Sequence, residues 1–85
     1  MEVIFTPKAL ADLSDWQRSG NVKLQSKIKE LLQVIAVTPF TGVGKPEALK
    51  HNLSGKWSRR INQEHRIVYS VADEAIYVYS LKGHY

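Results

Sequence analysis

The sequence of 85 residues contains no cysteine, so no disulfide bond stabilises it. It also has no apolar run near the ~20 residues that a membrane-spanning helix needs. Acidic residues stand within the first 20 positions, at Glu2, Asp12 and Asp15, so we expect no secretory signal there. These absences predict a single soluble domain over residues 1–85 that works in the reducing cytoplasm and does not enter a membrane.

Acidic residues are scarce in one quarter of the chain, which makes that quarter strongly basic. Residues 45–66 hold six basic and two acidic residues, whereas the remainder holds six of each and is neutral. Such a concentration of positive charge is typical of proteins that bind a polyanion, with phosphate the leading candidate. A solvated basic surface without any such partner is the alternative that charge alone leaves open.

Hydrophobic periodicity predicts one strand and two helices in the first half of the chain. Residues 2–6 favour a strand, and Thr6 followed by a proline is typical of a helix N-terminus. That helix is expected to end at Ser19 and Gly20, and Asn21 is expected to cap a second helix. The second helix carries one apolar stripe at intervals of three and four: Leu24, Ile28, Leu31, Leu32 and Ile35.

The second half of the chain predicts strands. A loop rich in proline and glycine starts at residue 38, and residues 49–53 are expected to form a short strand. Three further segments, 56–61, 65–72 and 76–81, favour consecutive strands joined by short turns. This order predicts an α+β fold in which the two N-terminal helices pack on one face of a twisted, largely antiparallel sheet of four to five strands. The expected core comprises Leu13, Ile28, Leu31, Leu32, Ile35, Ile67, Tyr69 and Val78, with Trp16 at least partly buried.

Three common kinds of functional site find no support in the sequence. The histidines, His51, His65 and His84, are far apart and no cysteine accompanies them, so we expect neither a metal ion nor another cofactor. The glycines of GVGKPE lack the spacing of a phosphate-binding loop, and no serine stands in the context of an activated nucleophile.

A carboxylate and several cations remain as candidates for chemistry on a phosphate. Glu47 lies between Lys45 and Lys50, whose positive charge favours the ionised carboxylate that a general base needs. Arg60 and Arg66 lie on predicted strands joined by the short turn NQEH. Adjacent antiparallel strands would place both guanidinium groups on one sheet face, where they would attract an external anion.

The sequence ends in His84 and Tyr85, which follow the last predicted strand after only two residues, Lys82 and Gly83. A histidine exchanges a proton near neutral pH, and a tyrosine can stack on a nucleobase. A base, a pair of cations and an acid are together the groups that metal-free RNA cleavage requires. Ordinary alternatives stay open: a surface glutamate at Glu47, a salt bridge from Glu64 to the arginines, and a frayed chain end.

The stretch of residues 38–71, TPFTGVGKPEALKHNLSGKWSRRINQEHRIVYSV, together with the final HY, resembles the YoeB toxin family of the RelE superfamily. The similarity extends over essentially the whole chain, including VIFT near the start and Trp16 in the first helix. It implies a RelE-like fold and a toxin of a type II toxin–antitoxin pair. Such toxins enter the ribosomal A site and cut mRNA without a metal, leaving a 2′,3′-cyclic phosphate and a 5′-hydroxyl.

The resemblance also implies roles for individual residues. It places the general base at Glu47, the phosphate-stabilising arginine at Arg66, the general acid at His84 and a substrate-orienting tyrosine at Tyr85. The expected contacts to RNA or its phosphates are Lys45, Lys50, Arg59 and Arg60, of which Lys50 and Arg60 match further basic residues at or beside the family's site. The implied partners are an acidic YefM-like antitoxin and the ribosome with its mRNA, and the resemblance also allows a homodimer.

Two positions depart from the family pattern. Gly83 stands where an aromatic residue often precedes His-Tyr, which predicts a looser chain end and fewer substrate contacts. Lys56 stands where an apolar residue often sits, which adds positive charge. Two other functions therefore stay open: a module that occupies RNA or the ribosome without cutting, and a protein-interaction module whose basic patch meets only an acidic partner.

Overall fold

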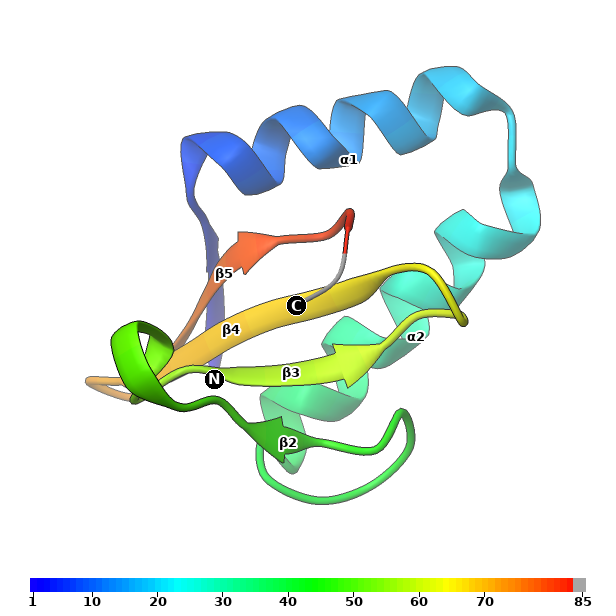
Figure 1. Ribbon diagram of the computed structural model, residues 1–85. Coiled ribbons are helices and arrows are strands. Elements are labelled where there is room, and N and C mark those ends of the chain that lie inside the picture. Colours follow the sequence, from blue (N-terminus) through cyan, green and yellow to red (C-terminus); the bar gives the residue numbers. More distant parts are fainter. Residues whose placement is uncertain (84–85) are drawn as a thin grey trace.

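The computed structural model describes residues 1–83, which form a five-stranded sheet with two helices (Figure 1). Along the chain the elements are β1 (Glu2–Phe5), α1 (Pro7–Ser19), α2 (Val22–Val37), β2 (Glu47–Ala48), the 3₁₀ turn η1 (His51–Leu53), β3 (Trp57–Arg60), β4 (Arg66–Ala72) and β5 (Ala75–Ser80). His84 and Tyr85 lie outside the described residues. Within the described part, no helix is long and apolar enough to cross a bilayer.

The sheet is mixed, with the strand order β1-β5-β4-β3-β2. Strands β2 to β5 pair antiparallel with their neighbours, whereas β1 runs parallel to β5. The β4–β5 hairpin turns at Asp73 and Glu74, whose φ angles of 51° and 60° are those of a tight turn with two left-handed residues. The predicted α+β class, the largely antiparallel sheet and the helices on one face are confirmed.

Both helices begin and end where the sequence predicts. The Thr6 hydroxyl accepts a hydrogen bond from the Ala9 N–H at 3.3 Å, and the following proline occupies the first helical position. Helix α1 ends at Gly20, whose φ of 74° is the left-handed conformation that glycine adopts without strain. Asn21 caps α2, because its side-chain oxygen accepts from the Leu24 N–H at 3.0 Å.

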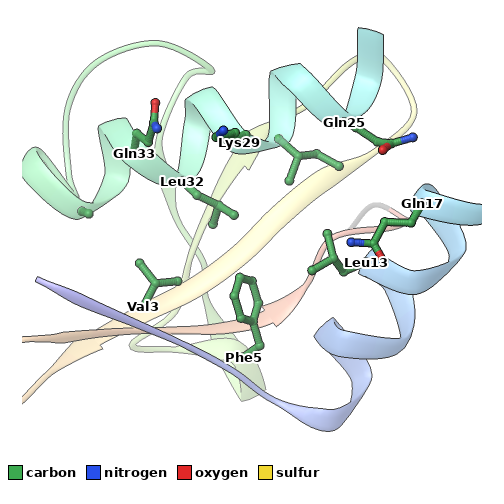
Figure 2. Close-up of a pocket in the computed structure, with 10 residues that line it drawn as sticks. Val3, Phe5, Leu13, Gln17, Gln25, Lys29, Leu32 and Gln33 are labelled. Carbon is green, nitrogen blue, oxygen red and sulfur yellow. The ribbon is translucent and has the colours of Figure 1, made fainter. Parts of the chain in front are cut away.

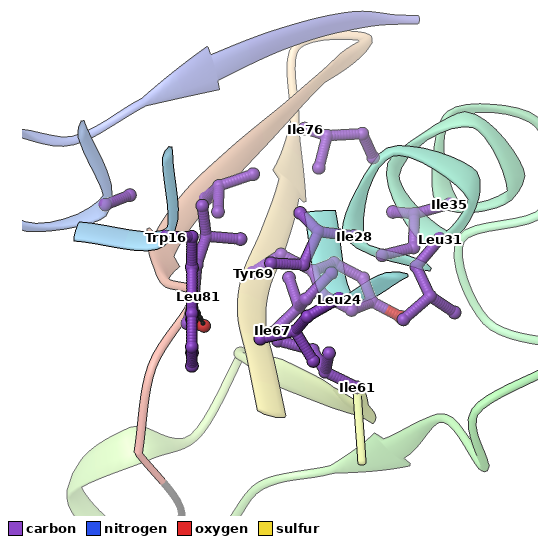
Figure 3. Packing of buried hydrophobic residues seen from close by; sticks show 12 residues of the cluster. Trp16, Leu24, Ile28, Leu31, Ile35, Ile61, Ile67, Tyr69, Ile76 and Leu81 are labelled. Atoms are coloured by element: carbon purple, nitrogen blue, oxygen red, sulfur yellow. Dashed lines mark hydrogen bonds between the residues drawn. The ribbon is translucent and has the colours of Figure 1, made fainter. Parts of the chain in front are cut away.

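The core lies between the helices and one face of the sheet (Figure 3). Trp16 is only 9% exposed and belongs to this core, as predicted. Full burial of a large apolar side chain contributes about 1.5–3 kcal/mol to folding, so these contacts dominate the stability of the fold. The buried members from α2 and the two central strands are Leu24, Ile28, Leu31, Ile35, Ile67, Tyr69, Ile76 and Val78.

Two residues of the predicted core, Leu13 and Leu32, are only half-buried. Together with Val3 and Phe5 they line an apolar groove of about 500 Å³ between α1, α2 and β1 (Figure 2). The two helices diverge from their shared corner, which opens this groove (Figure 1). Both leucines therefore lie on the predicted side of their helices, toward the core, but they are not fully buried.

The predicted strand at residues 49–53 is wrong. The strand is instead β2, two residues long, which pairs with Trp57 and Ser58 of β3. Residues 51–53 form the turn η1, and His51 has a φ of 60°, which an extended strand does not contain. Glu47, which directly follows the loop, is therefore the first residue of this paired strand.

Candidate active site

The helices cover one face of the sheet, and the opposite face carries three of the predicted site residues, Glu47, Arg60 and Arg66. Arg60 of β3 is paired directly with Arg66 of β4, and Glu47 of β2 is paired with Ser58 of β3. Ser58 lies two residues before Arg60, so both side chains point to the same side of the strand. We call this surface the open face, defined by Glu47, Ser58, Arg60 and Arg66. The prediction that Arg60 and Arg66 share one face is confirmed.

Arg66 is turned along the open face by a hydrogen bond. Its Nη1 donates to the Ser58 Oγ at 3.0 Å, and Ser58 is fully buried. Among residues 1–83, Arg66 forms no ion pair with a carboxylate. Glu64 lies instead near His65, with 3.7 Å between Oε2 and Nε2, so the predicted alternative of a salt bridge from Glu64 to the arginines is wrong.

Backbone contacts set the position of Glu47. The Arg60 N–H donates to the Gly44 carbonyl at 2.7 Å, which extends the pairing of β2 and β3. Gly44 has a φ of 88°, and a Cβ there would lie 3.1 Å from the Arg60 carbonyl oxygen, so a glycine is required. Lys45 and Lys50 flank β2 in the sequence and are exposed, as is Glu47. The three side chains are therefore accessible to a ligand.

Arg59 is a correction to the sequence prediction, because its side chain is 0% exposed and cannot contact RNA. Its Nε donates to the Tyr69 hydroxyl at 3.2 Å, and its Nη1 donates to the Val43 carbonyl at 3.2 Å. Its Nη2 donates to the carbonyls of Thr41, at 2.7 Å, and of Thr38. A guanidinium has five N–H donors, so one arginine can bind all three of these loop carbonyls. Arg59 thus organises the loop that leads into β2.

Tyr69 completes this buried network. Its hydroxyl accepts from Arg59 and donates to the Pro39 carbonyl. Burial raises the pKa of the Tyr69 hydroxyl above its ordinary value of 10.0, and the hydrogen bond and positive charge of Arg59 partly oppose this shift. The phenol therefore stays protonated at neutral pH, and the network stabilises the fold without transferring protons.

The chain that follows β5 returns to the start of β4. The Arg66 N–H donates to the Gly83 carbonyl at 2.9 Å, and the Gly83 N–H donates to the His65 Nδ1 at 2.9 Å. Gly83 is the residue before His84, so the position next to the predicted acid is bonded to the backbone of the predicted phosphate-stabilising arginine. His84 and Tyr85 themselves lie outside the described residues, and their roles stay predictions.

The sequence prediction missed two features of the open face. Ser58, the partner of Arg66, was not identified, although its spacing from Arg60 was an available signal. Lys56 was noted only as an added charge. Its Nζ lies 4.2 Å from the centre of the Tyr79 ring, a cation–π contact, and the Tyr79 hydroxyl lies 2.8 Å from the Ser70 Oγ. Basic and aromatic groups therefore continue beyond the predicted site toward β5.

Two hollows of the surface differ in their relation to the predicted site. None of the predicted site residues lines the apolar groove between α1, α2 and β1. A shallower depression of about 340 Å³ is lined by Lys27, Lys45 and Arg60 among others, so it extends the basic surface toward α2. For residues 1–83, no group of three or more metal-ligating side chains is placed to hold an ion. The expected absence of a cofactor stays a prediction.

Comparison with known proteins decides the family. The model of a family described as "YoeB-like toxin of bacterial type II toxin-antitoxin system" matches residues 5–85. The chain belongs to this family. The Toxin YoeB of Synechocystis sp. is 47% identical over 85 residues, covering 100% of this chain and 98% of the relative. The family resemblance that the sequence motifs indicated is confirmed.

Solved structures of the family have the same fold. The "YoeB/ParE toxin from Agrobacterium tumefaciens" superposes with a TM-score of 0.95 at 39% identity, covering 100% of both chains. A YoeB dimer from Staphylococcus aureus gives a TM-score of 0.90, and a heterotetrameric YoeB-YefM complex from the same species gives 0.89. Both are 45% identical and cover 100% of this chain and 98% of the other. The RelE-like architecture is confirmed.

Proposed function

We propose that this member of the YoeB family is a ribosome-dependent mRNA endoribonuclease that cuts mRNA in the A site and thereby inhibits translation. One observation carries the proposal: three separate segments of the chain converge on the open face. Arg66 is bonded to Ser58, Ser58 is paired with Glu47, and Gly83 is bonded to the Arg66 backbone. These contacts bring the segments of the proposed base, of the proposed phosphate-stabilising cation and of the residue before the proposed acid next to one another, and in a chain of a toxin family this supports one shared site.

In the proposed reaction the nucleophile is the ribose 2′-hydroxyl on the 5′ side of the scissile phosphate. The Glu47 carboxylate accepts its proton while the 2′-oxygen forms a bond to phosphorus. Arg66 stabilises the negative charge that develops on the crowded phosphorane. His84 donates a proton to the 5′-oxygen as the bond from phosphorus to that oxygen breaks. The products are a 2′,3′-cyclic phosphate and a 5′-hydroxyl.

The proposed role of the ribosome is to align the RNA on an exposed face. The 2′-oxygen, the phosphorus and the 5′-oxygen must lie in line, and such orientation contributes about 7–11 kcal/mol to lowering a barrier. Lys45, Lys50 and Arg60 bind the RNA backbone, and Tyr85 orients the substrate. Proton transfer and charge stabilisation both come from side chains, so the proposal includes no metal or cofactor. Cleavage of free RNA is expected to be weak.

The proposal is tested with programmed ribosomes that carry an mRNA with one 2′-deoxy sugar immediately 5′ of the scissile phosphate. Without the 2′-hydroxyl there is no nucleophile, so cutting at that position stops while an all-ribose mRNA is cut. Glu47→Gln is expected to slow cleavage about 10²–10⁴-fold. Glu74→Gln is the matched control, because it neutralises an exposed carboxylate in the β4–β5 turn.

Two outcomes would contradict the proposal in different ways. Normal cutting of the deoxy-substituted mRNA would mean that water is the nucleophile and that the roles of Glu47 and His84 are wrong. Ribosome binding without cutting of either mRNA would favour a non-catalytic module that occupies the ribosome.

We also propose an acidic, YefM-like antitoxin as a partner, and a homodimer as a further assembly. The S. aureus relative occurs in a complex with YefM and as a dimer. The net charge of +4 on this chain favours rapid association with an acidic segment. Addition of the antitoxin should slow hydrogen exchange in residues 45–66 or at the chain end. Unchanged exchange in both regions would contradict this partner surface.

A further inference from the structure

Helix α1 holds the segment that joins β5 to the predicted acid. The Asp12 Oδ2 accepts a hydrogen bond from the Leu81 N–H at 3.0 Å, and the Trp16 Nε1–H donates to the Leu81 carbonyl at 2.9 Å. The Lys8 Nζ donates to the Lys82 carbonyl at 3.3 Å. Residues 8, 12 and 16 recur at intervals of four, so one side of the helix makes all three contacts.

Gly83 is held by the turn between β3 and β4. Its N–H donates to the His65 Nδ1 at 2.9 Å, and its carbonyl accepts from the Arg66 N–H at 2.9 Å. Gly83 has a φ of 96° and no side chain that packing could fix. These two hydrogen bonds therefore constrain the residue that precedes His84, and they oppose the looseness that the sequence predicts at Gly83.

The imidazole of His65 is itself fixed in place. Its side chain is 16% exposed and lies edge-on to Trp16, with ring centres 4.8 Å apart and ring planes at 80°. Its backbone N–H donates to the Asn62 Oδ1 at 2.8 Å, and its carbonyl accepts from the Ile61 N–H at 2.9 Å. Because the Gly83 N–H donates to Nδ1, this nitrogen carries a lone pair and the ring proton is on Nε2.

We propose that His65 is a positioning residue for RNA cleavage: its Nδ1 fixes Gly83, the residue through which the chain leads into the proposed general acid His84. This inference rests on the proposed function, because it needs His84 as the general acid. A misplacement of about 1 Å in a reacting group can cost about 10²-fold in rate. The contact with the Trp16 ring fixes the orientation of the His65 ring, so the Nδ1 acceptor points toward the Gly83 N–H.

Two substitutions separate the contribution of the Nδ1 acceptor of His65 from the contribution of its aromatic ring. His65→Phe keeps an aromatic ring against Trp16 and removes the acceptor. His65→Asn removes the ring but places a side-chain oxygen near the position of Nδ1. Single-turnover cleavage of mRNA on programmed ribosomes is measured over a range of ribosome concentrations, which separates the cleavage step from ribosome binding. His51→Asn, at the exposed histidine of η1, is the matched control.

His65→Phe is expected to slow the cleavage step about 10–100-fold and to change the half-saturating ribosome concentration less than about 2-fold. His65→Asn is expected to rescue most of the lost rate. Hydrogen exchange at the Gly83 amide in the free protein gives a readout that does not depend on catalysis. The amide should be protected in the wild type and in His65→Asn, and unprotected in His65→Phe. Should the Phe variant lack the wild-type circular dichroism spectrum, His65→Leu, which also lacks an acceptor, takes its place.

The outcomes distinguish this inference from the proposed function. A wild-type protein that does not cut mRNA on the ribosome overturns the proposed function and the positioning role together. Cleavage that is slowed by Glu47→Gln but not by His65→Phe overturns the positioning role alone. A His65→Phe defect confined to ribosome binding, with the cleavage step unchanged, also overturns it.

Discussion

Replacing the buried Arg59 with methionine is expected to destabilise the fold and not to remove a contact with RNA. Methionine is unbranched and flexible, so it can fill much of the same space. The substitution removes four hydrogen bonds, to the Tyr69 hydroxyl and to the carbonyls of Val43, Thr41 and Thr38. The three carbonyls belong to the loop that leads into β2, so the position of Glu47 should also be lost.

The magnitude follows from the charge and burial of the lost donors. A hydrogen bond from a charged group contributes about 1.5–3 kcal/mol, and disrupting a buried charged network costs about 3–5 kcal/mol. Thr38, Thr41 and Val43 are exposed, so water can replace some of the lost donors. We therefore expect a loss of about 3 kcal/mol in the free energy of unfolding. The total for a domain of this length is roughly 4–13 kcal/mol, so the loss is a large fraction of it.

Urea unfolding of the free protein measures this loss, and the salt dependence of binding to a short RNA measures phosphate contacts. Arg60→Met is the matched control on the exposed side of the same strand. It should change the free energy of unfolding by less than about 0.5 kcal/mol and lower the salt slope by about 0.7–1. The reasoning is refuted if Arg59→Met unfolds like the wild type and lowers the salt slope as Arg60→Met does.

Three further predictions concern the network, the loop and the helix cap. Burial raises the pKa of Tyr69, so above pH 10.0 the phenolic proton is lost more readily from the unfolded state than from the folded state. The free energy of unfolding should therefore fall as the pH rises above 10.0, and it should fall less steeply in Tyr69→Phe. Urea unfolding at increasing pH measures both slopes. Gly44→Ala should lose about 1–3 kcal/mol in urea unfolding. It should lose more than Gly55→Ala, whose φ is similarly positive but whose Cβ would meet nothing within 4 Å; equal losses would contradict the clash with Arg60. Asn21→Ala should cost about 1 kcal/mol at an unchanged m-value, whereas Asn21→Ser should be nearly neutral.

The helices were predictable because their signals are local. A capping side chain bonds to a backbone N–H two or three residues away, so Thr6 and Asn21 identify both starts without knowledge of the fold. The end of α1 at Gly20 is equally local. Burial along the stripe of α2 was less predictable, since Leu32 faces the core but lies at the groove where the helices diverge. The angle between two helices depends on packing that the sequence does not display.

The open face was predictable from strand alternation. The same alternation indicates that Arg59 points to the opposite, buried face. Alternation groups Arg59 with Trp57 and Ile61, both apolar, and separates it from Ser58 and Arg60. That grouping indicates burial, whereas the basic side chain and its neighbours in the basic segment indicate a contact with RNA. The partners of Arg59 are mostly backbone carbonyls. Every residue carries one, so no side-chain motif in the sequence predicts these contacts.

The short strand β2 was not predictable for a different reason. Its length is limited by left-handed residues on both sides, Lys45 with a φ of 52° and His51 with a φ of 60°. Neither residue type marks such a conformation, and alternation over two residues gives no periodic signal. The flanking lysines and the resemblance to the family both indicated Glu47 as a site residue, but no local pattern indicated the strand on which it lies.

The open face is held in place from the buried side of the molecule. Arg59 holds the loop before Glu47, Ser58 turns the Arg66 guanidinium, and His65 holds the residue before the predicted acid. Arg59, Ser58 and His65 are buried or nearly so, and the groups that they bind belong to three different segments of the chain. Three separately anchored segments fix the backbone around the proposed site and the Arg66 guanidinium, whereas Glu47 stays exposed. This arrangement fits the proposed chemistry, in which the protein supplies the proton transfers and the charge while the ribosome aligns the RNA.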